Sequence, residues 1–211
     1  MSLEQCIRYL IYIHAFIGGI ALVSGSLPLI FKKGGRVHKT AGQLFRVSLV
    51  IAALLALIIS ISPGHENDFL FCIGVFSLYL TLSGISSLKF KTRKPKAFDY
   101  TLSGIMLLFS LLMLGQSAII WYKIGRLHIL FVVFGLIGLL LSGADFRNFS
   151  KPKSLKSRYM GMHIGKTTGA FIATFTAFLV TNQVLPPLVS WLAPTAIGVV
   201  FIFYWVRRCS R

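Results

Sequence analysis

Four of the five histidines in this chain have the residue type and surroundings expected of ligands to a buried metal centre. They are His14, His38, His128 and His163. Each falls in or beside a long apolar segment, where ionisable side chains are rare and usually functional. A b-type haem bound on both faces needs two imidazoles from different helices at the same depth. The fifth histidine, His65, stands beside Glu66 and Asp68 and is expected to be a solvated surface residue.

The composition predicts the kind of element that positions these histidines. Hydrophobic residues make up 55% of the 211 residues and charged residues only 13%, against roughly a quarter charged in soluble domains. That length accommodates about six or seven membrane spans of about 20 residues each, with short connections and no separate soluble domain. The sequence therefore predicts an all-α polytopic membrane helix bundle, with residues 1–211 forming a single transmembrane domain.

The apolar segments along the chain predict about seven transmembrane helices. The segments are 7–31, 42–62, 69–88, 99–120, 127–145, 164–183 and 188–206. The sixth is the least apolar, because Lys166 lies near its start and several threonines follow. Helical threonines can bond back to the preceding turn, which keeps a threonine-rich span compatible with the membrane.

The distribution of cations predicts the orientation. Of the 22 lysines and arginines, only Arg8, Lys123 and Arg126 fall on one side of the predicted bundle. The others fall near residues 32–46, 89–96 and 147–166 and at the C-terminal Arg207, Arg208 and Arg211. Lys and Arg are retained in cytoplasmic loops, so we expect the N-terminus outside and the C-terminus in the cytoplasm.

The same cations indicate a partner. The net charge is +17, but the cations stand in short loops beside apolar helices rather than on a folded basic face. We therefore expect no nucleic acid as a partner. Anionic lipid headgroups on the cytoplasmic side of the membrane are the expected partner.

This topology sorts the histidines into two pairs. His14 and His128 fall in the outer half, and His38 and His163 in the inner half. Two bis-histidine haem b sites, one above the other, would make a transmembrane electron carrier whose redox partner the sequence does not name. The outer pair differs in depth by about 6 Å at about 1.5 Å per residue. The alternative is that His14 bonds within the bundle while the other three are interfacial side chains at helix ends.

Charges near the spans add a second hypothesis. Arg46 lies about one turn inside the second helix and Asp145 closes the fifth, so we expect them to form a charge pair. Asp145 has Arg147 and Arg158 as alternative partners, and Arg46 has the inner headgroups.

Other function classes remain open at this point. A small-molecule transporter or channel and a non-catalytic membrane scaffold are the alternatives to the electron carrier. The only acids near spans, Asp99 and Asp145, stand at predicted cytoplasmic ends, which disfavours a proton-driven carrier. Whether the chain is an enzyme is left open. Cys6 and Cys72 both fall near the outer face, either as a disulfide or as packing residues.

Two segments carry a resemblance to known proteins. The stretch from His14 to Gly25, with Lys33 to Gly42 after it, and the stretch that begins at His163 resemble an uncharacterised family of bacterial multi-pass membrane proteins. The resemblance implies a location in the cell inner membrane and no established activity. More remotely, the histidine layout is similar to that of transmembrane dihaem b-type cytochromes, although here the histidines fall on helices 1, 2, 5 and 6 rather than on four consecutive helices.

Overall fold

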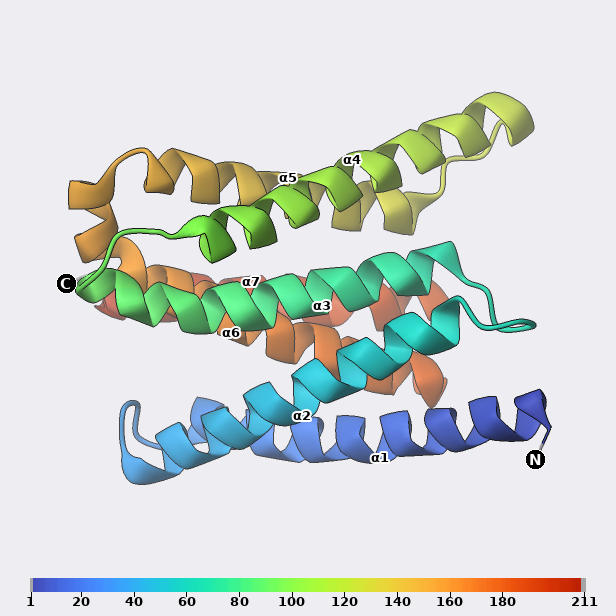
Figure 1. Ribbon diagram of the computed structural model, residues 1–211, viewed down its shortest axis with the longest axis horizontal. Coiled ribbons are helices and arrows are strands. Elements are labelled where there is room, and N and C mark those ends of the chain that lie inside the picture. The colour runs from blue at the N-terminus through green and yellow to red at the C-terminus, as the bar shows by residue number, and fades with distance from the viewer. Residues whose placement is uncertain (1, 210–211) are drawn as a thin grey trace.

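Seven long α-helices follow one another along residues 2–209, which are the residues described by this computed structural model (Figure 1). They are α1 (Leu3–Ile30), α2 (Arg36–Ser60), α3 (Asp68–Ser87), α4 (Ala97–Ile124), α5 (Ile129–Phe149), α6 (Pro152–Thr181) and α7 (Pro187–Cys209). A short 3₁₀ helix, η1 (Leu88–Lys91), continues α3. Arg211, one of the cations that predict the orientation, lies outside the described residues.

Each of the seven helices is long enough and apolar enough to span a membrane. Successive helices run in alternating directions between the same two ends of the bundle (Figure 1). The predicted all-α fold with seven spans is confirmed, including the threonine-rich sixth span. The chain is an integral multi-pass membrane protein, and its orientation remains a prediction.

One helix is much longer than its apolar segment. α6 begins at Pro152, whereas the apolar segment begins at residue 164. Proline suits the first turn of a helix because its missing N–H would have no intrahelical partner there. The polar residues that follow continue the helix without adding hydropathy, so the apolar pattern alone places the start of this helix too late.

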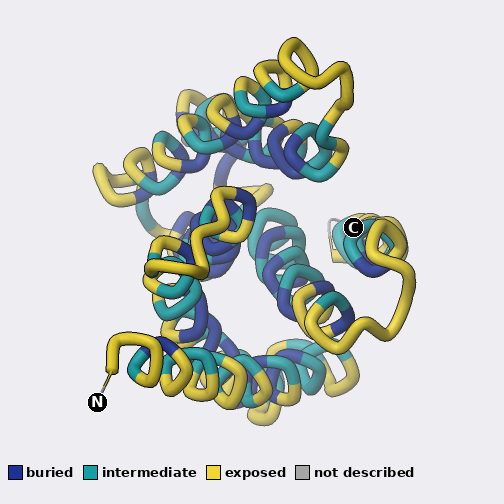
Figure 2. Tube along the Cα trace, turned by 90° about the vertical axis from the view of Figure 1, so that its right-hand side faces the viewer, coloured by how far each residue is buried: buried dark blue, intermediate teal, exposed yellow. Residues whose placement is uncertain are grey.

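The third helix is the centre of the bundle. α3 packs against α2, α4 and α6, while α1 pairs with α2, α4 with α5, and α6 with α7. Figure 2 shows the α4–α5 hairpin as a separate layer beside the other helices. At Gly84, α3 lies close against α6. A Cβ there would lie 3.0 Å from the Lys166 Cβ and 3.1 Å from the Thr167 backbone nitrogen.

Lipid-facing surfaces surround this core. Large apolar side chains such as Phe16, Leu140 and Ile197 are 71%, 71% and 72% exposed. Such exposure is expected where hydrocarbon rather than water is the solvent. Tyr79 and Met106 are among the fully buried side chains. Side chains that face lipid and side chains that face the core are both mostly apolar. The buried polar side chains are therefore the candidates for function.

Most of the lysines and arginines belong to segments at one end of the bundle, the end on the left of Figure 1. We call this the basic end. It comprises the loop at residues 31–35, η1 with the loop that follows it, the turn between α5 and α6, and the last turn of α7.

Candidate functional site

The inner histidine pair lines a single cavity near the basic end. His38 lies in the first turn of α2 and His163 lies in α6, and both face a cavity of about 340 Å³. Residues of α1, α3 and α7 complete its wall. Helices far apart in the sequence thus bring together two of the four histidines that the sequence selects.

Both of these imidazoles are held by backbone carbonyls. The Nδ1 atom of His38 lies 3.2 Å from the Pro28 carbonyl oxygen, and that of His163 lies 2.9 Å from the Gly84 carbonyl oxygen. A carbonyl oxygen only accepts hydrogen bonds, so in each ring Nδ1 is the donor and the tautomer follows from this partner. In the neutral ring the Nε2 lone pair is then available to a metal.

Lys33 anchors the rim of the same cavity. Its Nζ donates to the Pro28 and Leu29 carbonyl oxygens, at 2.7 Å each, and lies 4.6 Å from the centre of the Trp205 ring. These carbonyls belong to the last turn of α1, where backbone acceptors have no intrahelical partners. Partial burial lowers the pKa of Lys33 below its usual value, while a thiolate at Cys209 would raise it.

The wall of this cavity is basic and aromatic. Besides the histidines it carries the cationic Lys33, Lys39 and Arg46, with no aspartate or glutamate among the described wall residues. Phe45, Phe171, Phe201 and Trp205 supply aromatic surface. Such a wall favours a group that is flat or apolar over most of its area and anionic at one edge.

The outer pair of histidines is not brought together in the same way. His14 bonds across to α2, with Nδ1 2.9 Å from the Ala52 carbonyl oxygen. His128 precedes α5 and packs among aromatic rings, with ring centres 6.0 Å from Phe69 and 4.7 Å from Phe131. Its Nδ1 is buried without a hydrogen-bond partner among the described residues. Neither residue lines the cavity that holds His38 and His163.

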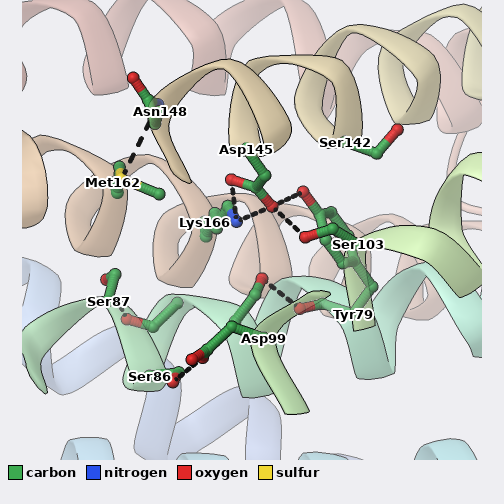
Figure 3. Close-up of polar contacts among 12 residues, drawn as sticks. Tyr79, Ser86, Ser87, Asp99, Ser103, Ser142, Asp145, Asn148, Met162 and Lys166 are labelled. Atoms are coloured by element: carbon green, nitrogen blue, oxygen red, sulfur yellow. Dashed lines mark hydrogen bonds and ion pairs between the residues drawn. The ribbon is translucent and has the colours of Figure 1, made fainter. Parts of the chain in front are cut away.

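Asp145 is the centre of a buried polar network (Figure 3). Lys166 Nζ lies 2.7 Å from its Oδ1 and 2.6 Å from its Oδ2. The hydroxyls of Tyr79 and Ser103 donate to Oδ2, at 2.6 Å and 2.8 Å. Asp145 is 1% exposed and Lys166 5%, and four helices, α3, α4, α5 and α6, meet at this carboxylate.

This network corrects the predicted charge pair. Asp145 has Lys166 as its ionic partner, not Arg46, Arg147 or Arg158. Arg46 lies on the wall of the histidine cavity, and Arg158 donates to the Asn148 side chain at 3.1 Å. The reason is the early start of α6 at Pro152, which carries Lys166 several turns into the helix rather than leaving it at the membrane edge. The sequence contained a signal for this pair: an aspartate in the fifth apolar segment and a lysine in the sixth, where charged residues are rare.

Asp99 is a second buried carboxylate, and it pairs with the half-buried Arg93 at the basic end. It accepts from Arg93 Nη1 at 2.6 Å, from the Lys96 backbone N–H at 2.8 Å and from the Ser86 hydroxyl. This carboxylate caps the first turn of α4 and ties the preceding loop to α3. Its place in the structure is explained by local capping.

The three cysteines, Cys6, Cys72 and Cys209, are free thiols, and Cys72 is buried. The structure therefore gives no disulfide between Cys6 and Cys72.

Comparisons of the chain with protein-family models, curated proteins and solved structures give no match. The fold and the buried polar groups define the class, an integral multi-pass membrane protein with ionisable side chains inside its helix bundle. The resemblance to a bacterial membrane protein family remains an expectation from the sequence.

Proposed function

We propose that this protein is a membrane electron carrier that binds one b-type haem between His38 and His163. The observation that carries the proposal is the shared geometry of the two imidazoles. Both line one cavity, and each commits Nδ1 to a backbone carbonyl, which leaves Nε2 as the ligating atom. Bis-histidine ligation suits electron transfer because both axial positions of the iron are filled.

The remaining wall residues support the same group. Lys39 and Arg46 stand on the wall as cations for the two propionates, while most of the hydrogen-bonding capacity of Lys33 is already used by the end of α1. Phe45, Phe171 and Trp205 offer apolar surface to the macrocycle and exclude water from it. The bound haem supplies one-electron redox chemistry, and the chain supplies ligation, orientation and charge compensation.

The proposal is limited to one haem for each chain. His14 and His128 bond and pack against different helices, so their geometry does not support a second haem in the outer half. A single haem near the basic end would exchange electrons with a partner at that end.

An optical spectrum tests this function directly. The protein is purified in mild detergent from cells supplied with iron, and a reduced-minus-oxidised spectrum is recorded. We expect the sharp reduced bands of bis-histidine haem, with about one haem per chain. His38→Ala or His163→Ala should abolish the bands. His14→Ala and His128→Ala are the matched controls and should keep them.

Two results contradict the proposal. One is a folded protein from haem-replete cells with no haem absorption. The other is full haem content in both His38→Ala and His163→Ala, because the haem would then bind elsewhere.

A further inference from the structure

A second cavity, of about 370 Å³, lies beside the buried Asp145–Lys166 pair. It runs between α5, α6 and α7, and its wall extends from that pair to Asn148, Ser157 and Arg158. Ser157 and Arg158 are exposed near the basic end, so the cavity connects the surface there with the buried carboxylate. Asp145 is the only acidic residue among the described residues of this wall, which also carries two cations.

The two oxygens of Asp145 have different surroundings. Oδ2 accepts from Lys166, Tyr79 and Ser103, whereas among the described residues only Lys166 bonds to Oδ1. Oδ1 is therefore the atom that can take a proton while the other oxygen keeps two hydroxyl donors. The Asp145 side chain can thus become neutral without losing its place in the network.

The basic partner of Asp145 also differs from that of the other buried carboxylate. Asp99 is paired with Arg93, and an arginine stays charged at all physiological pH values. Asp145 is paired with Lys166, a single ammonium on a flexible stem that can turn toward a new partner. Asp99 does not line the second cavity, whereas Asp145 and Lys166 both do.

Charge balance determines what this cavity can accept. The ion pair is neutral as a unit, and a net charge in a low-dielectric interior is strongly disfavoured. An anion that bonds to Lys166 adds one negative charge, and a proton on Asp145 removes one. Either event alone leaves the buried cluster charged, whereas the two together keep it neutral.

From this geometry we propose that the second cavity binds a small monovalent anion together with one proton, the anion on Lys166 and the proton on Asp145. When the anion enters, Lys166 Nζ leaves Asp145 for the anion, and a proton from solution at the basic end binds to Oδ1. Tyr79 and Ser103 continue to donate to Oδ2. The binding is electroneutral, and it does not depend on haem at the first cavity.

The charged and titratable groups around Asp145 are compatible with this exchange. On α3 the neighbour is Tyr79, which donates from its neutral form. On α4 it is Asp99, whose charge is already balanced by Arg93. On α6, Lys166 and Arg158 both favour the anion. The described wall residue from α7 is Val206, which is apolar.

Proton uptake on addition of an anion tests the proposal. Purified full-length protein in weakly buffered detergent solution near neutral pH is titrated with the sodium salts of chloride, nitrate and acetate, and the proton balance is followed with an indicator dye. We expect at least one of these anions to bind with uptake of about one proton per anion. Its apparent Kd should rise about tenfold for each unit of increase in pH.

Four variants test which side chain binds the anion and which binds the proton. Asp145→Asn removes the proposed proton acceptor. When the anion binds, the unaltered protein should show the infrared band of a newly protonated carboxyl group, and Asp145→Asn should not. Lys166→Met should not bind the anion. Ala144→Leu fills the cavity while leaving both charged side chains in place, and should weaken binding at least tenfold. Asp99→Asn is the matched carboxylate control and should take up protons as the unaltered protein does.

The proposal is overturned if none of the three anions causes proton uptake. It is also overturned if the protonated-carboxyl band is missing when the unaltered protein binds the anion, if that band appears in Asp145→Asn, or if Ala144→Leu binds the anion as tightly as the unaltered protein. These outcomes are independent of haem content, which the optical spectrum measures separately.

Discussion

At the scale of single residues, the most unusual feature of this protein is a buried pair of charged side chains. In a bundle whose core and surface are both apolar, Asp145 and Lys166 carry opposite charges that are almost fully removed from solvent. Each charge is tolerated because the other lies 2.6 Å away, and two hydroxyls satisfy the carboxylate further. Removing one partner therefore costs much more than removing both.

At this scale we predict an asymmetry between single and double replacements. Lys166→Met leaves a buried carboxylate unpaired and should lower the free energy of unfolding by about 3–5 kcal/mol. The double variant Asp145→Leu with Lys166→Met leaves no buried charge and should recover most of that loss. Thermal unfolding in the same detergent measures both. An equally unstable double variant would contradict the prediction.

Small residues allow neighbouring helices to meet closely. Gly84 allows α3 to touch α6, so that His163 reaches a carbonyl of α3 and Lys166 lies near Tyr79. Two glycines on neighbouring helices show that the need for a small side chain differs from one position to another. A Cβ at Gly84 would press on the backbone of α6, whereas a Cβ at Gly104 in α4 would meet nothing within 4 Å.

We predict opposite effects for alanine at these two positions. Gly84→Ala should lower the free energy of unfolding by about 1–3 kcal/mol, because α3 and α6 must separate to admit the methyl group. Gly104→Ala should be neutral or stabilising by up to about 1 kcal/mol, since alanine favours a helix interior over glycine. Unfolding of both variants in one detergent gives the comparison, and equal effects would argue against a tight α3–α6 contact.

The molecule as a whole is polarised along its long axis. The basic end carries η1, the α5–α6 turn and the rims of both cavities, and the opposite end has few cations. If the orientation predicted from the cations holds, both cavities open toward the cytoplasm. Under the two proposals, electron transfer between the haem and its redox partner and entry of the anion would then take place on the cytoplasmic side.

Reporter fusions test this orientation. A reporter after the C-terminus should read as cytoplasmic and one before Ser2 as external, because loops rich in lysine and arginine are retained inside. The odd number of spans requires the two ends to report from opposite sides. Reports from the same side would show that one of the helices does not cross the membrane, and α6, the least apolar, is the first to examine.

The sequence by itself determined the class of fold and the number of spans. Those properties depend on the apolar content of each segment, because every backbone polar group in a bilayer must be satisfied inside its own helix. The sequence also selected His38, His163 and Asp145 as candidates, since ionisable groups in apolar segments are few.

Only the tertiary structure decided which of these side chains meet. Partners are set by where each helix begins, how it is rotated and which helices cross, and apolar content reports none of these. Because α6 starts at Pro152 and contacts α3 at Gly84, Lys166 faces Asp145 and His163 shares a cavity with His38. The same packing leaves Arg46 on the wall of that cavity and holds His14 against α2.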